Sequence, residues 1–162
     1  MSTGCFGRLS RSTSPRGARW GRDRFYTGGG TQYLFGRGMG PEEIAFTEDG
    51  PLYRTERYFV PVPRGPKGYR IPLPPGAYRV ALHFAEIHEP ARNRRENGFR
   101  RVFDVRLEGK TVLEEYDPGA KGFAAADVRT FDVAVEDGIL DIEFVHRVEN
   151  PKVSAIEVIR LE

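Results

Sequence analysis

The fold class of this chain can be predicted from residues 76–84, Gly76-Ala77-Tyr78-Arg79-Val80-Ala81-Leu82-His83-Phe84. Its large apolar residues stand at every second position: Tyr78, Val80, Leu82 and Phe84. A period of two places successive side chains on opposite faces of the backbone, which is typical of a strand with one buried face. The stretch therefore predicts a β-strand that packs its aromatic and aliphatic face against a core.

The same alternation recurs along the chain, in 102–107, 131–135 and 140–144, with turn sequences such as Pro74-Pro75-Gly76 and Glu136-Asp137-Gly138 between the runs. Val153 to Leu161 is apolar on both faces, as in a central strand. The pattern predicts an all-β fold, an antiparallel β-sandwich or jelly roll, without a long helix in 52–161. The residues expected to be buried together are Tyr78, Leu82, Phe84, Phe103, Val105, Phe131, Ile142, Phe144 and Ile156.

Composition and charge exclude several classes of protein. Leu, Ile, Val and Phe make up about a quarter of the 162 residues, which is enough for a packed core. No apolar run approaches the roughly 18 residues of a membrane-spanning helix, so no membrane insertion is expected. With Cys5 as the single cysteine, neither an internal disulfide nor a multi-cysteine metal site is possible.

The N-terminal segment differs in composition from the rest. Residues 1–40 contain seven Arg and one Asp but few large apolar residues, and 1–19 are expected to form a flexible Arg/Gly-rich arm before a domain at 20–162. The arm has no interleaved aromatics and no periodic basic face, so no nucleic-acid partner is predicted. No apolar run follows Arg8, Arg11 and Arg16, so no signal peptide is recognised.

One connection is too long for a hairpin. Between Glu86 and Phe99 runs a polar segment, and long loops on a sandwich are places where ligands bind, or else simple insertions. The charged part, Arg92 to Glu96, is expected to be a solvated loop.

Six blocks, taken in order and spacing, resemble the malectin domain over about residues 20–162. They are 52–58 (Leu-Tyr-Arg-Thr-Glu-Arg-Tyr), 69–73 (Tyr-Arg-Ile-Pro-Leu), 76–78 (Gly-Ala-Tyr), 82–87 (Leu-His-Phe-Ala-Glu-Ile), 101–105 (Arg-Val-Phe-Asp-Val) and 150–158 (Asn-Pro-Lys-Val-Ser-Ala-Ile-Glu-Val). The apolar stretch ending in Asn-Ala-Gly-Gly that usually opens the family does not occur, so that strand is expected to be missing.

The resemblance implies a galactose-binding-like β-sandwich that binds carbohydrate without cleaving it, with no cofactor. It implies recognition of glucose-containing oligosaccharides, of the α-linked disaccharide type, and an extracellular or lumenal setting. Family members hold the sugar with tyrosines, a Tyr-Phe pair after the Phe-Ala-Glu block, and an Asp before Asn-Pro-Lys. The matching positions here are Tyr33 (or alternatively Tyr26), Tyr58, His88, Glu89 and Glu149.

The chemistry of these residue types fits a sugar. A tyrosine ring packs on the C–H face of a pyranose and its hydroxyl forms hydrogen bonds, while a carboxylate such as Glu149 accepts two hydroxyl hydrogen bonds. Ordinary packing within the sandwich is the alternative interpretation of Tyr33 and Tyr58. His88, Glu89 and Glu149 differ from the Tyr, Phe and Asp that the family has at these positions. These differences leave the specificity for glucose disaccharides open.

Other functions were weighed against this one. A glycosidase needs two suitably spaced carboxylates, one with a raised pKa; Glu86, Glu89 and Glu149 are candidates, but the resemblance implies a structural role for Glu86, and no enzyme is predicted. The three histidines lack metal-ligand spacing and are expected at the surface. The second hypothesis is a protein-interaction module of a larger surface or multidomain assembly, with the sugar site degraded.

Overall fold

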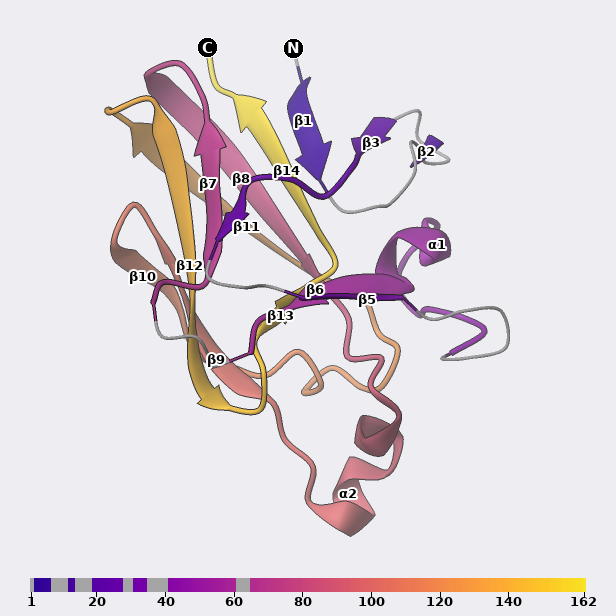
Figure 1. Cartoon of the computed structure of the whole chain (residues 1–162). Coiled ribbons are helices and arrows are strands. Elements are labelled where there is room, and N and C mark those ends of the chain that lie inside the picture. The colour runs from indigo at the N-terminus through magenta and orange to yellow at the C-terminus, as the bar shows by residue number, and fades with distance from the viewer. Residues whose placement is uncertain (1, 7–11, 14–18, 28–30, 35–40, 61–64) are drawn as a thin grey trace.

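The computed structural model describes residues 2–6, 12–13, 19–27, 31–34, 41–60 and 65–162, and the side chains of 20–27, 41–60 and 65–162 among them. The described strands form three sheets, and the two larger sheets pack face to face as a β-sandwich (Figure 1). This confirms the predicted all-β class. In the described part of the chain each helix is only four or five residues long: α1 (Gly50–Tyr53), η1 (Glu89–Asn93) and α2 (Arg94–Asn97).

The first sheet contains the strand that decided the fold class. Its order is β11 (Asp127–Val135), β8 (Gly76–Phe84), β14 (Ala155–Arg160), β1 (Ser2–Phe6), β3 (Arg19–Gly21) and β2 (Ser12–Thr13). β14 lies between β8 and β1, as its apolar residues on both faces predicted.

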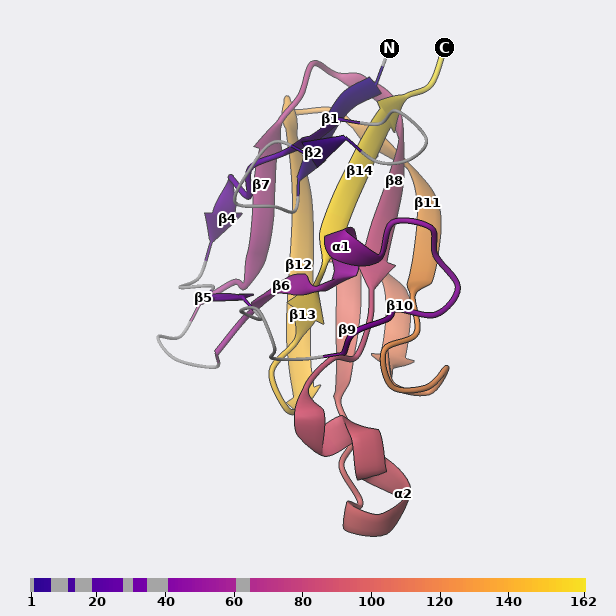
Figure 2. The ribbon, with the colours of Figure 1, turned by 90° about the vertical axis from the view of Figure 1, so that its right-hand side faces the viewer.

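The second sheet faces the first across the core. Its order is β10 (Lys110–Tyr116), β9 (Val102–Leu107), β12 (Ile139–Val148), β7 (Gly68–Pro72) and β4 (Tyr26–Thr27). A small third sheet of β13 (Lys152–Val153), β6 (Thr55–Tyr58) and β5 (Thr31–Leu34) crosses one side of the sandwich (Figure 2). The η1–α2 loop lies beyond one end of the two large sheets.

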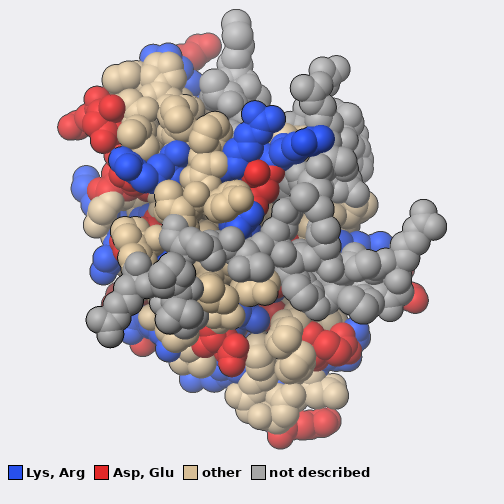
Figure 3. Space-filling view, viewed as in Figure 1, with Lys and Arg blue, Asp and Glu red and all other residues tan. Residues whose placement is uncertain are grey.

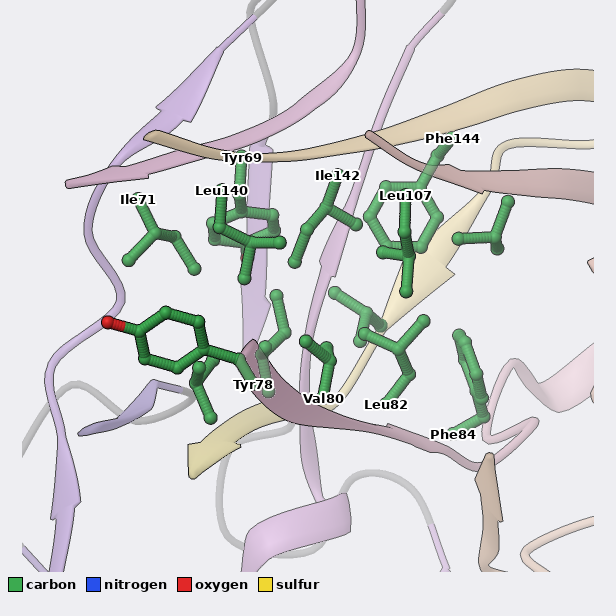
Figure 4. Packing of buried hydrophobic residues seen from close by; sticks show 14 of the residues in the cluster. Tyr69, Ile71, Tyr78, Val80, Leu82, Phe84, Leu107, Leu140, Ile142 and Phe144 are labelled. Carbon is green, nitrogen blue, oxygen red and sulfur yellow. The ribbon is translucent and has the colours of Figure 1, made fainter. Parts of the chain in front are cut away.

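The alternation in β8 has the predicted consequence. Tyr78, Val80, Leu82 and Phe84 are fully buried and point at residues of the opposite sheet, among them Ile71, Leu107, Leu140, Ile142 and Phe144 (Figure 4). Eight of the nine residues expected in the core belong to this cluster of buried residues; the ninth, Phe131, is only partly buried and packs against it, because β11 is the edge strand of its sheet.

His83 contradicts the expectation that the histidines lie at the surface. It faces away from the main core into a second apolar cluster on the outer side of the first sheet, which includes Trp20 and Tyr53. The Trp20 ring meets the imidazole edge-on at 5.3 Å, and His83 Nδ1 shares a 2.8 Å hydrogen bond with the Tyr53 hydroxyl. Burial lowers the pKa of His83 to about 4.

The N-terminal segment takes part in the first sheet. β1 pairs antiparallel with β14, with Cys5 opposite Glu157, and β3 pairs parallel with β1. The predicted flexibility of residues 1–19 is a statement about motion, which strand pairing does not measure, so it stays a prediction. The predicted start of the folded domain at residue 20 also stays a prediction. The pairing of β1 means that removal of the segment would expose one edge of β14.

Candidate functional site

A buried carboxylate organises one end of the sandwich. Glu86, two residues after β8, is 1% exposed. Its Oε2 accepts a 2.6 Å hydrogen bond from Arg101 Nε, and its Oε1 accepts 3.0 Å hydrogen bonds from Lys152 Nζ and from the His88 backbone N–H. Burial raises the pKa of Glu86, but Lys152 and Arg101 outweigh this effect and hold it at about 2.

Lys152 extends this cluster to the third sheet. Its side chain is fully buried and ion-pairs with Glu56 on β6 as well as with Glu86. Lys152 also pairs with Tyr58 in the β13–β6 ladder. The buried charges therefore fix the strand that carries Tyr58 to the end of β8.

Arg101 connects the same cluster to a second chain segment. Its Nη1 donates a hydrogen bond to the backbone carbonyl of Asn150, in the turn between β12 and β13. Glu86 in turn binds the backbone of His88, where the η1–α2 loop begins. One buried ion pair, Glu86–Arg101, thus anchors both the long loop and the turn that holds Glu149.

Local sequence shapes the long loop. α2 ends at Gly98, whose φ of 72° is the left-handed conformation that glycine adopts without steric cost. The Asn97 side chain donates to the Pro90 carbonyl at 2.8 Å and accepts from the Phe99 N–H at 2.9 Å. Arg94 ion-pairs with Asp117, so the segment expected as a freely solvated loop is tethered at this residue.

A groove of about 470 Å³ lies between the loop and the turn. Phe99 and Val148 provide apolar surface, and Glu149 and Arg100 provide charge. The lining residues are Pro90, Asn97, Gly98, Phe99, Arg100, Val148 and Glu149. An aromatic ring beside an exposed carboxylate can present both a flat apolar surface and hydrogen-bond acceptors to a ligand.

One predicted site residue, Glu149, lines this groove, and a second, His88, contacts the lining residue Phe99. Glu149 is exposed, with a left-handed φ of 59° in the β12–β13 turn. His88 is exposed and its ring lies 5.5 Å from that of Phe99, centroid to centroid. Glu149 and His88 are therefore brought to the same end of the sandwich from positions 61 residues apart in the sequence.

The other three predicted residues lie elsewhere or outside the described side chains. Tyr58 is half-buried at the end of β6, opposite Lys152, and is not part of the groove lining. Glu89 is exposed and ion-pairs with Arg92 at 2.6 Å. The Tyr33 backbone pairs with Glu56 in the β5–β6 ladder; its side chain lies outside the described residues.

Sequence reasoning missed Phe99, Val148 and Arg100 as groove residues. Phe99 follows Asn97-Gly98, a turn signal that marks where the polar loop ends, and this could have identified it as an aromatic at a loop exit. No comparable local signal marks Val148, which is 47% exposed at the end of β12.

A larger groove of about 650 Å³ lies beside another part of η1. Arg92 and Phe123 line it together with Glu42 and Glu43, and the Arg92 guanidinium lies 4.3 Å from the centre of the Phe123 ring. Glu149 lines the smaller groove and not the larger one, so the smaller groove is the better candidate for the predicted site.

Two of the candidate carboxylates for glycoside cleavage, Glu86 and Glu89, lack the raised pKa of a general acid. A proton donor near neutral pH needs a raised pKa, whereas the pKa of Glu86 is about 2. The hydrogen bond from Arg92 lowers the pKa of Glu89 as well. Within the described residues, no three His, Cys, Asp or Glu side chains are arranged to hold a metal ion.

The described surface carries charges of both signs. On the face shown in Figure 3, lysine and arginine side chains are interspersed with aspartate and glutamate side chains. None of the helices in the described ranges is long and apolar enough to cross a bilayer.

Comparison with known proteins identifies relatives. A family model described as the malectin domain matches residues 4–156, from within β1 to within β14. Malectin-B of Xenopus laevis is 30% identical over 70% of this chain and 43% of that protein. A probable leucine-rich repeat receptor-like serine/threonine-protein kinase of Arabidopsis thaliana is 35% identical over 51% of this chain and 9% of the kinase. The chain spans less than half the length of these relatives.

Solved structures share the fold. A β-glucuronidase of Bacteroides uniformis superposes with a TM-score of 0.76 at 23% identity, over 98% of this chain and 18% of the enzyme. The plant complex of the peptide RALF23 with FER and LLG2 gives a TM-score of 0.74 at 16% identity, over 99% of this chain and 49% of the matched chain.

The match of the family model extends over nearly the whole chain, and the sandwich agrees with it. Members of this family are non-catalytic binding domains. The chain belongs to the malectin-domain family.

Proposed function

We propose that this chain is a non-catalytic carbohydrate-binding module that recognises glucose-containing oligosaccharides, of the α-linked disaccharide type, at the groove between the η1–α2 loop and the β12–β13 turn. The observation that carries the proposal is that Phe99 and Glu149 both line that groove. A pyranose presents an apolar face and a rim of hydroxyls. The Phe99 ring can pack on the apolar face, and the Glu149 carboxylate can accept hydrogen bonds from the hydroxyls.

The rigidity of the groove walls supports the same proposal. The two walls are rooted in the buried Glu86–Arg101 pair through the His88 amide and the Asn150 carbonyl. A preformed site loses less conformational entropy when it binds a small ligand. Tyr58 lies outside the groove lining, but its ladder partner Lys152 follows the β12–β13 turn that carries Glu149, and we include Tyr58 in the proposed surface on the family resemblance.

Isothermal titration with maltose and nigerose tests the proposal. Truncation of a central aromatic contact costs about 2 kcal/mol or more of binding free energy. We therefore expect Phe99→Ala and Tyr58→Ala to weaken binding more than tenfold, and Glu149→Ala to weaken it through the loss of a charged acceptor. Replacement of His88-Glu89 by the family's Tyr-Phe pair is expected to raise the affinity for maltose.

A matched control is available on another surface. Phe46 is 73% exposed and lies outside the groove, so Phe46→Ala should bind each sugar as the unmodified chain does. Circular dichroism of every variant establishes that the fold is intact. If the folded, unmodified chain binds no α-glucoside, including on a glycan array, the proposal is wrong.

The alternative is a protein-interaction module of a larger assembly. It draws support from the receptor-like kinase that shares 35% identity with this chain, and from the solved complex of FER with a peptide and LLG2. Absence of glycan binding by the folded chain would make this alternative the leading account.

A further inference from the structure

A small cavity lies where the third sheet meets the sandwich. Its wall includes Glu56 and Arg57 from β6, Ser154 from the junction of β13 and β14, and Tyr69 from β7. Glu56, Arg57 and Ser154 are each more than nine-tenths buried, with exposures of 6%, 6% and 3%. The space left for a water-sized molecule is about 10 Å³.

Three polar atoms on this wall have unused hydrogen-bonding capacity. Arg57 Nη1 and Ser154 Oγ are buried atoms without a hydrogen-bond partner among the described residues. Glu56 Oε2 is ion-paired with Lys152, and a carboxylate oxygen with two lone pairs can accept a further hydrogen bond. Buried polar groups in folded proteins are satisfied almost without exception, by protein or by ordered water, so a concentration of such atoms on one cavity indicates an occupant.

The charges around the cavity indicate a neutral occupant. Arg57 is paired with Asp23 at 2.5 Å, and Glu56 is paired with Lys152, so the positive and negative side chains balance. An additional ion would remain uncompensated in a buried environment. The available donors and acceptors, an N–H, a hydroxyl and a carboxylate oxygen, match the two donors and two acceptors of a water molecule.

We propose that one ordered water molecule occupies this cavity and bridges Arg57, Ser154 and Glu56. The volume admits a single water, and two to four polar partners are usual for a buried one. The water thereby joins β6, the strand that ends in Tyr58, to the β13–β14 junction. This inference does not depend on the proposed carbohydrate function.

Nuclear magnetic resonance on the intact chain, with ¹³C-labelled valine methyl groups, tests the proposal. Val153 lines the cavity and is 2% exposed, so its methyl protons should show a cross-peak to water that has the sign of a long-lived contact. Val80, fully buried in the main apolar core, is the matched control and should show none. The absence of a water contact at Val153 would overturn the proposal.

A Ser154→Ala variant and a high-resolution crystal structure complete the test. Removal of one partner should weaken or abolish the Val153–water cross-peak, while Thr130→Ala, an exposed change on β11, should leave it unchanged. In the crystal, electron density within hydrogen-bonding distance of Arg57 Nη1 and Ser154 Oγ should fit one water. The proposal would be contradicted by electron density for an ion, or by a Ser154 hydroxyl that donates its hydrogen bond to a protein acceptor. This result from the crystal structure is independent of the Ser154→Ala variant.

Discussion

Replacement of Glu86 by glutamine is the most informative test of the buried ion pairs that anchor the groove. Gln keeps the shape of the side chain and an oxygen acceptor for the His88 amide, but it removes the charge that faces Arg101 and Lys152. Both cations are deeply buried, so they cannot recover their hydration when the carboxylate is gone. We expect a large loss of stability.

The magnitude follows from the pKa of Glu86. The folded chain holds this pKa at about 2, against an ordinary value of 4.5. The difference is about 2.5 pH units, and at about 1.36 kcal/mol per unit the ionised form stabilises the fold by roughly 3 kcal/mol. Removing one partner of a buried ion pair typically costs about 3–5 kcal/mol, which agrees.

The pH dependence identifies the mechanism. Because the folded pKa is depressed, the contribution of Glu86 is complete above pH 4.5 and is lost as the pH falls through the range from 4.5 to about 2. Urea denaturation of the unmodified chain and of Glu86→Gln should therefore differ by about 3 kcal/mol at pH 7, and the gap should narrow below pH 4.5.

A surface pair provides the control. Glu143 lies 3.2 Å from Arg106 with both side chains partly exposed, so Glu143→Gln should cost less than about 1 kcal/mol. If Glu86→Gln also costs less than about 1 kcal/mol at pH 7, or if its effect is the same at pH 7 and pH 3, the buried pair does not anchor the groove as argued.

Two further predictions concern the first sheet. Burial lowers the pKa of His83 from 6.5 to about 4, so the free energy of unfolding should fall by up to about 3 kcal/mol as the pH decreases from 6.5 to 4. The free energy of unfolding of His83→Gln, measured by urea denaturation, should depend less on pH in this range. If both proteins show the same pH dependence, His83 is not held in the neutral form by the fold. Deletion of residues 1–19 tests the arm: a flexible arm predicts an unchanged melting temperature, whereas the pairing of β1 with β14 leads us to expect a lower one, measured by calorimetry.

Local sequence was sufficient to predict the layers of the fold. The period of two in 76–84 is a property of neighbouring residues, and a strand of that pattern has one face to bury whatever its partners are. Turn sequences such as Glu136-Asp137-Gly138 likewise act within a few residues. The family resemblance then supported the same fold, and the place of Glu86 within the Phe-Ala-Glu block implied a structural role for it.

The histidines show where this approach fails. His83 alternates with core residues, so a rule based on one buried face places it outside. The tertiary structure covers that outer face with Trp20 and Tyr53, from segments 63 and 30 residues away, and so leaves the His83 side chain only partly exposed. No pattern within β8 contains this information.

Apolar periodicity and turn residues are local signals, so they were enough to predict the β-sandwich and its main core, while the family was recognised from the resemblance of its sequence blocks. Only the tertiary structure decided the site. The ion pairs of Glu86 join residues 15 and 66 positions apart. The groove is lined both by Phe99, from the segment before β9, and by Glu149, from the turn after β12. Charged residues in sequence look solvent-exposed, and they become an internal anchor only when folding places opposite charges together away from water.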